Sequence, residues 1–153
     1  MLALLLALLI GIVAGLRAMT APAAVSWAAY LGWINLADST LWFLGHWITP
    51  WIFTVLALVE LVTDQLPSTP SRTVPVQFGA RIVMGALSGA ALGAASGSLF
   101  GALVAGILGA VIGTLGGRSV RAKLAATFGS DRPAAFLEDA VAIVGALLIV
   151  SAA

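Results

Sequence analysis

The chain has 153 residues, of which 61% are hydrophobic and 8% are charged, and its mean hydropathy is +1.13. Soluble domains carry about 25% charged residues, so this composition excludes an ordinary water-soluble domain. The net charge of +1 provides no field for holding nucleic acid, and the lack of cysteine excludes disulfides and thiol catalysis. One histidine, His46, cannot form a two-histidine metal site. We therefore expect one all-α membrane domain over residues 1–153, with no metal and no cofactor.

Six apolar stretches predict a compact bundle of about six transmembrane helices, at 2–16, 21–36, 50–66, 76–95, 99–115 and 134–150. A span needs about 20 apolar residues, so the second stretch, about 24 Å long as a helix, crosses barely or is re-entrant. The first stretch resembles a signal peptide, but its one charge, Arg17, follows the apolar run instead of preceding it. We therefore expect an uncleaved first span.

The basic residues predict the orientation of these spans. If six spans alternate, all seven basic residues lie on one side, which the positive-inside rule assigns to the cytoplasm. Both termini are then external, and five spans would instead separate Arg17 from the other six basic residues. Aromatic residues fall at the external ends and indicate an interfacial belt or a ligand-stacking gate: Tyr30, Trp33, Trp42, Phe43, Trp47 and Trp51.

Small residues recur every four positions across the fourth and fifth spans. Such a stripe lets helix backbones approach closely in a membrane. The series crosses a turn, so we expect two facing stripes of a glycine-zipper hairpin, a homo-oligomer seam or a pore lined by backbone. Its members are Gly85, Gly89, Gly93, Gly97, Gly101, Ala105, Gly109, Gly113 and Gly117.

Charged residues inside the predicted spans mark the candidate site. Buried charges in a membrane cost roughly 2.5 to 3.5 kcal/mol each, so they pair with one another or face a water-filled cavity. The acids could bind a cation or carry a proton, the arginines could hold a phosphate or carboxylate, or the set could be an ion-pair staple between helices. The set comprises Arg17, Glu60, Asp64, Arg81, Glu138 and Asp139. Arg72, in the loop between the third and fourth spans, is a further cation.

A basic segment follows the fifth span. Arg118, Arg121 and Lys123 alternate there with apolar residues and predict a short amphipathic extension along the inner membrane surface. Each basic residue near an anionic surface contributes about 1 kcal/mol of attraction. We therefore expect these three side chains to contact membrane lipid.

Four ordered segments resemble a family of small bacterial integral membrane proteins known only as a domain of unknown function. They are GLRAMTAPAAV at 15–25, ELVTDQLP at 60–67, PSR at 70–72 and FLEDAVA at 136–142. The resemblance covers nearly the whole chain and implies a bacterial inner-membrane helical bundle. It supplies no activity, substrate or catalytic residue.

Three functions remain open from the sequence. The first is a transporter or channel for an ion or a small anionic solute, with a charged site facing the cytoplasm. The second is a non-catalytic scaffold or accessory subunit that assembles, as a homo-oligomer or with a partner, through its glycine-rich helices. A metal-dependent membrane enzyme is the weakest, because adjacent Glu138 and Asp139 point about 100° apart on a helix. We therefore expect no enzymatic activity.

Overall fold

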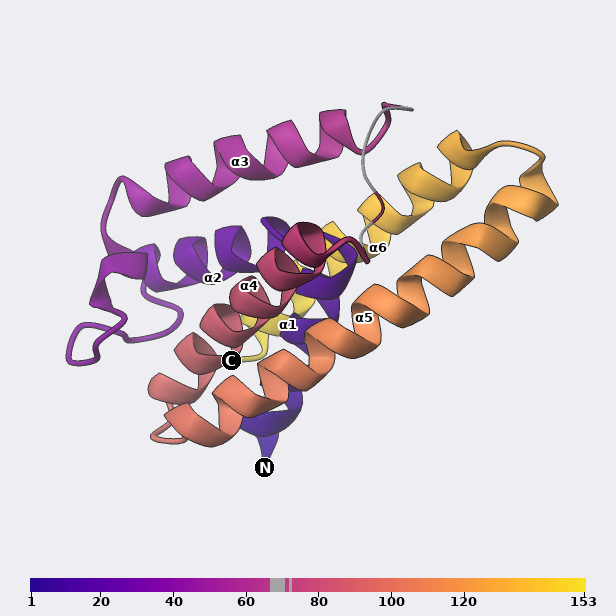
Figure 1. The fold of residues 1–153 in the computed structure, drawn as a ribbon. Helices are drawn as coiled ribbons and strands as arrows, with labels where there is room; N and C mark the ends of the chain where they lie inside the picture. The colour runs from indigo at the N-terminus through magenta and orange to yellow at the C-terminus, as the bar shows by residue number, and fades with distance from the viewer. Residues whose placement is uncertain (67–70, 72) are drawn as a thin grey trace.

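The fold is all-helical, as the sequence predicted. The computed structural model describes residues 1–66, 71 and 73–153, and within these residues the regular structure is helical throughout. These residues form six α-helices and one short 3-10 helix, and Figure 1 labels the α-helices from α1 to α6. Their bounds are α1 Leu2–Leu16, α2 Thr20–Tyr30, η1 Trp42–Gly45, α3 Thr49–Thr63, α4 Pro75–Ala94, α5 Leu99–Phe128 and α6 Asp131–Ser151.

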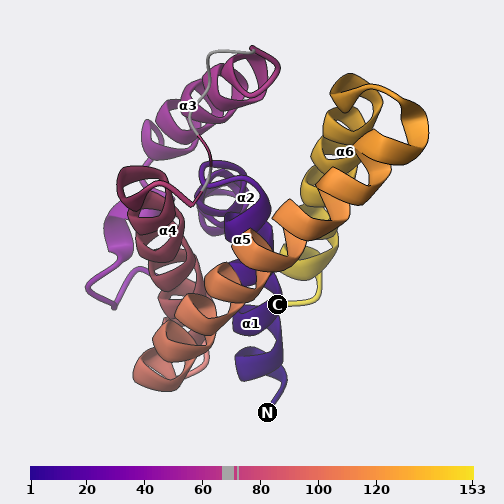
Figure 2. The same cartoon turned by 45° about the vertical axis from the view of Figure 1, so that its right-hand side comes forward.

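The first helix lies at the centre of the bundle. α1 packs against α5, α4, α6 and α2, and Ile10 and Ala14 on it are fully buried. In Figures 1 and 2, α4 and α5 form a hairpin beside α1, whereas α3 lies at the periphery. α3 packs mainly against α2 and η1, and Pro50 is the buried residue that the structure records on it. The peripheral helix is therefore held by fewer neighbours than the rest.

Helix length and composition support membrane association. Three helices, α4, α5 and α6, are long and apolar enough to cross a membrane, and α1 and α3 are shorter apolar helices of 15 residues each. The 15-residue helices are about 22 Å long, short of a hydrocarbon core of about 30 Å. Large apolar side chains such as Val55, Leu108 and Leu148 are more than half exposed. These outer faces suit a lipid environment.

Two helices end earlier than the sequence predicted. We expected the second stretch to extend to residue 36, but α2 stops at Tyr30 because Gly32 adopts a left-handed conformation, φ +80°. The amides of Trp33 and Ile34 then bond to the carbonyl of Ala28. α3 ends at Thr63, three residues before its predicted end. The chain therefore reverses between α2 and α3 through irregular backbone and η1.

α5 is longer than predicted. We expected the span to stop at residue 115 and to be followed by a short amphipathic extension along the membrane surface, but one straight helix runs to Phe128 (Figure 1). Gly116 and Gly117 weaken a helix by about 1 kcal/mol each relative to alanine, which is not enough to end it. The helix ends instead at Gly129, whose φ is +70°.

The bundle has two chemically different ends. A hollow of about 250 Å³ at one end is lined by Leu2, Trp33, Ala95 and Ala153, among others, so both termini, the loop after α2 and the α4–α5 turn lie together. We call this the terminal end. Arg17, at the close of α1, lies at the other end, which we call the charged end. Both termini and the α4–α5 turn therefore lie at the opposite end of the bundle from the C-terminus of α1.

Glycines allow α4 and α5 to touch through their backbones. A Cβ atom placed on Gly89 would lie 2.5 Å from the carbonyl oxygen of Ala102 and 2.9 Å from Cα of Gly106. A Cβ on Gly85 would lie 2.7 Å from the carbonyl oxygen of Gly106, and one on Gly93 2.6 Å from that of Ser98. These three glycines therefore lie at the interface between α4 and α5.

The α5 members of the series mostly face another helix. We expected Gly109 and Gly113 to oppose α4, but a Cβ on either would overlap the backbone of α1 around Leu8 and Ile12. Gly101 faces Leu4 of α1 as well. The expectation was wrong because a four-residue step drifts around a helix of 3.6 residues per turn, and the turn at Gly97 (φ +76°) resets the register. Gly106, outside the series, takes the α4-facing place.

Candidate functional site: a charged cavity

Arg17 is a fully buried cation bound by carboxylates from two helices. Its Nε donates to Oδ1 of Asp139 at 2.6 Å and its Nη1 to Oε1 of Glu138 at 2.7 Å. Its Nη2 lies 2.7 Å from Oδ2 of Asp64 and also contacts Asp139, as ion pairs outside hydrogen-bond geometry. A cation at the C-terminus of α1 also interacts favourably with the negative end of the helix dipole. Arg17 therefore ties α1 to α6 and to the end of α3.

Asp64 links this cation to a second one. The same Oδ2 atom accepts a hydrogen bond from Nη1 of Arg121, on α5, at 2.6 Å. Arg121 also binds Asp131, through Nε at 3.0 Å and Nη2 at 2.7 Å. This fork-to-carboxylate geometry is the strongest form of a charged hydrogen bond between side chains. The carboxylate of Asp64 therefore joins α1, α3 and α5.

Glu60 caps the start of α2 from a different helix. Its two carboxylate oxygens accept hydrogen bonds from the backbone amides of Ala18 and Met19, both at 2.8 Å. These amides precede or begin α2 and have no partner within a helix, and the positive end of the helix dipole also favours a carboxylate there. Glu60 thus fixes α3 to the α1–α2 turn.

Arg81, on α4, binds the C-terminal end of α1. Its Nη1 donates to the carbonyl oxygen of Gly15 at 2.7 Å, and its Nη2 lies 3.9 Å from Oε1 of Glu60. The hydroxyl of Thr114 also reaches that carbonyl, at 3.4 Å. Helix-terminal carbonyls lack partners inside their own helix, so Arg81 satisfies the end of α1. Its remaining surface borders open space.

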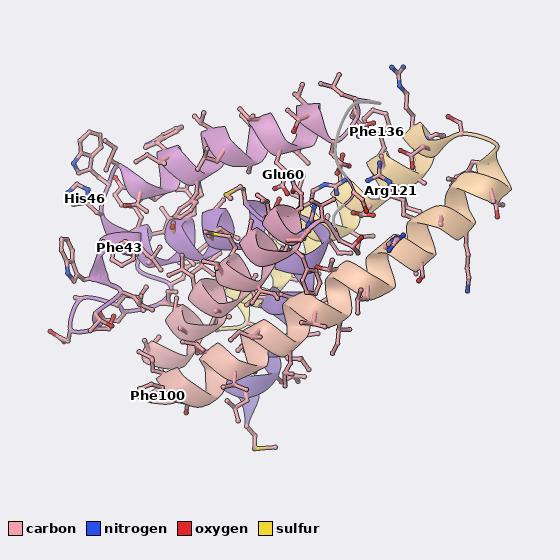
Figure 3. All side chains as sticks on the ribbon, viewed as in Figure 1. Phe43, His46, Glu60, Phe100, Arg121 and Phe136 are labelled. Atoms are coloured by element: carbon pink, nitrogen blue, oxygen red, sulfur yellow. The ribbon has the colours of Figure 1, made fainter. Side chains whose placement is uncertain are left out.

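A cavity of about 650 Å³ opens between α3, α4 and α5 at the charged end. Glu60 and Arg121, which border it, lie away from Phe43 and His46 in Figure 3. Apolar side chains such as Leu56 form part of its wall. Among the described residues, its charged lining consists of the cations Arg81, Arg118 and Arg121 and the anions Glu60, Asp64 and Asp131.

The charges thus divide into a closed part and an open part. Arg17, Glu138 and Asp139 do not border the cavity and bind one another directly. Arg118 does border it, and its Nη1 binds the hydroxyl of Thr73 at 3.3 Å rather than a carboxylate. A guanidinium held by a neutral group keeps its charge available to an anion. The open part is therefore suited to bind a small anion or to carry a proton on its acids.

The structure brings together six of the seven residues that the sequence proposed for the site. Arg17, Glu138 and Asp139 form the closed part, and Glu60 and Arg81 face the cavity. Asp64 belongs to both parts, because it pairs with Arg17 and borders the cavity. Arg72 lies outside the described residues. Among the proposed lipid contacts, Lys123 is exposed, but Arg121 is not a lipid contact in this structure, because its guanidinium turns inward to Asp64 and Asp131.

The sequence did not lead us to place three charged cavity residues in the site: Arg118, Arg121 and Asp131. A signal for Arg121 was available in the spacing. Residues 114, 118 and 121 share one face of a helix, and Thr114 on that face is buried. The signal failed because we ended the fifth span at residue 115. Asp131, the first residue of α6, lies outside the predicted sixth span and binds Arg121.

Among the described residues, no cluster of three metal-ligating side chains could hold a metal ion. The chain matches the family DUF4126, a domain of unknown function, over residues 4–153, and it belongs to that family. No curated protein and no solved structure matches it. The family membership agrees with the resemblance that the charged motifs gave, and it brings no activity with it.

Proposed function

We propose that this DUF4126 chain is a six-span protein of the bacterial inner membrane that transports an ion or a small anionic solute through its charged cavity. The observation that carries the proposal is the cavity of about 650 Å³ at the charged end, bordered by three arginines and three carboxylates. A purely structural ion-pair cluster would have no need of such an opening, because buried charges are best stabilised when they close on one another.

The end-to-end course of the helices supports six crossings. α2 begins beside Glu60 at the charged end, and the loop after it reaches Trp33 at the terminal end. α2 alone is about 16 Å long, so irregular residues 31–36 complete the passage. The described basic residues then all lie toward the charged end, which becomes cytoplasmic by the positive-inside rule. Both termini become external.

The peripheral position of α3 supports a mechanism. At its far end α3 is fixed to α2, where Nε1 of Trp27 donates to Oγ1 of Thr54 at 2.8 Å. At the charged end it is held by the carboxylates of Glu60 and Asp64. An anion that binds Arg118 and Arg121 competes with Asp64 for Arg121 and loosens that end of α3, which Arg17 and Glu60 still hold. Protonation of Asp64, once it has lost Arg121, would couple solute entry to a proton.

The test is flux in proteoliposomes loaded with a pH-sensitive dye, with inorganic phosphate and acetate as the two probe anions. We expect uptake of at least one probe that carries protons with it. Arg118→Gln should abolish that uptake without unfolding the protein, because Arg118 is exposed and holds no helix in place. Ser119→Ala, the adjacent control, should retain it. Normal uptake in Arg118→Gln, or no uptake of either probe by folded wild type, would count against transport.

The second candidate is a membrane scaffold or accessory subunit, and the exposed apolar face of α3 favours it. Val55, Leu58 and Val62 are each more than half exposed on that face, which leaves them for lipid or for a partner, including a second copy. The glycine faces offer less to a partner, since Gly89 and Gly113 are already used inside the chain. Val55→Trp should disrupt assembly, measured as mass in detergent, if α3 is the seam. An unchanged mass would remove this candidate.

A further inference from the structure

A second pocket lies on the opposite side of α5 from the charged cavity. It has a volume of about 340 Å³ and runs between α1, α5 and α6. On α5 its lining extends from Ile112 to Leu124, a length of about 18 Å along the helix. Leu16 and Val141 contribute from the two flanking helices. We call this pocket the α5–α6 groove.

A glycine without a packing partner, Gly116, helps to open the groove. A Cβ placed on Gly116 would have nothing within 4 Å, and Gly117 borders the groove beside it. Glycine inside a helix costs about 0.5 to 1 kcal/mol relative to alanine. Elsewhere in the bundle that cost is offset by close backbone contact, as at Gly113 against Ile12. At Gly116 the structure offers no such contact, so the missing side chain serves to keep the groove open.

The groove is suited to an apolar chain rather than to a polar solute. Its lining is apolar except for Arg121 and Glu138. The charged ends of these two side chains are bound elsewhere, to Asp64 and Asp131 in the first case and to Arg17 in the second. The described lining therefore offers few free polar groups to a ligand. Its long, apolar walls match an acyl chain in shape and polarity.

Two basic residues close to the groove lining in sequence do not line the charged cavity. Lys123 is next to the groove residue Leu124, and Arg132 is two positions before the groove residue Ala134. Lys123 and Arg132, on either side of the α5–α6 turn, are exposed. A second copy related by a two-fold axis along the membrane normal would bring these like charges together. An anionic headgroup would instead be attracted to them.

We propose that the α5–α6 groove retains the acyl chain of an anionic membrane lipid, with the lipid phosphate against Lys123 and Arg132. This site is independent of transport through the charged cavity. The bound chain fills the space that Gly116 and Gly117 leave between α5 and α6. The lipid then acts as a structural part of the bundle beside the α5–α6 turn.

The test is native mass spectrometry of the purified chain after equilibration in detergent with equal amounts of phosphatidylglycerol and phosphatidylcholine. We expect wild type to retain phosphatidylglycerol preferentially. Gly116→Leu and Val120→Trp, two independent ways of filling the groove, should each lose most of that lipid. Gly79→Leu is the matched control, because a Cβ on Gly79 of α4 also meets nothing within 4 Å and lies outside the groove.

A second pair of substitutions tests the headgroup. Each basic residue near an anionic surface contributes about 1 kcal/mol, so Lys123→Gln and Arg132→Gln should each lower the preference for phosphatidylglycerol about fivefold. Equal retention of the two lipids by wild type would overturn the proposal. So would unchanged lipid in both folded groove-filling variants. A drop in oligomer mass in those variants without lipid loss would assign the groove to a second copy instead.

Discussion

Removing the cation at the centre of the closed cluster should destabilise the bundle strongly. In Arg17→Met the carboxylates of Asp64, Glu138 and Asp139 lose the guanidinium that all three contact. At a charge separation of about 4 Å and an effective dielectric constant of 20, each pair contributes about 4 kcal/mol before desolvation. Desolvation offsets several kcal/mol per ion, and broken buried pairs have a net cost of about 3 to 5 kcal/mol.

The assay is thermal unfolding in detergent, followed by circular dichroism. For a chain of this size about 1 kcal/mol shifts the midpoint by 2 to 4 °C, so Arg17→Met should lower it by roughly 6 to 20 °C. Adding Glu138→Gln and Asp139→Asn to that variant should recover most of the loss, because the unpaired charges disappear. Lys123→Met, at an exposed cation, is the control. A midpoint for Arg17→Met equal to that of the control would refute the reasoning.

Three further predictions concern the packing and polar ties of the helices. Gly89→Leu should unfold the α4–α5 hairpin, because a Cβ on Gly89 lies 2.5 Å from a backbone carbonyl oxygen. Gly79→Leu should not, because a Cβ on Gly79 meets nothing within 4 Å. Gel filtration of both variants checks this. Glu60→Ala removes both acceptors of the α2 cap and should cost about 2 to 4 kcal/mol, measured by chemical denaturation, with a loss below 1 kcal/mol as the contrary result. Arg121→Met should speed amide exchange in α3 more than in α1, because it frees Asp64 at the end of the less packed helix; equal acceleration in both would oppose the assigned linkage.

The sequence predicted the helices and the grouping of charges because both depend on strong local signals. Long apolar runs fix where helices form, and charges inside such runs must meet one another. Arg17 and Asp139 are 122 positions apart in the chain and were placed in one site on that argument alone. The same argument could not separate the closed part from the cavity, since that division depends on how far α3 stands from α4 and α5.

The errors share a physical cause. The directions in which side chains face around a long helix depend on accumulated rotation, which a four-residue spacing only approximates. Gly109 and Gly113 consequently face α1, and Arg121 faces inward instead of toward lipid. The end of α5 was misplaced because the apolar run ends near residue 115, although tertiary contacts at Arg121 hold the helix beyond it.

The central claim, a water-filled cavity that binds an anion, can be tested most directly by single-cysteine labelling, since the native chain has no cysteine. Ala122 borders the cavity and is exposed, whereas Val104 lies on an outer apolar face of the same helix. In inside-out vesicles a membrane-impermeant maleimide should label Ala122→Cys, phosphate should slow that labelling, and Val104→Cys should stay unlabelled. Failure of Ala122→Cys to react from either side, or labelling that no anion slows, would contradict the account.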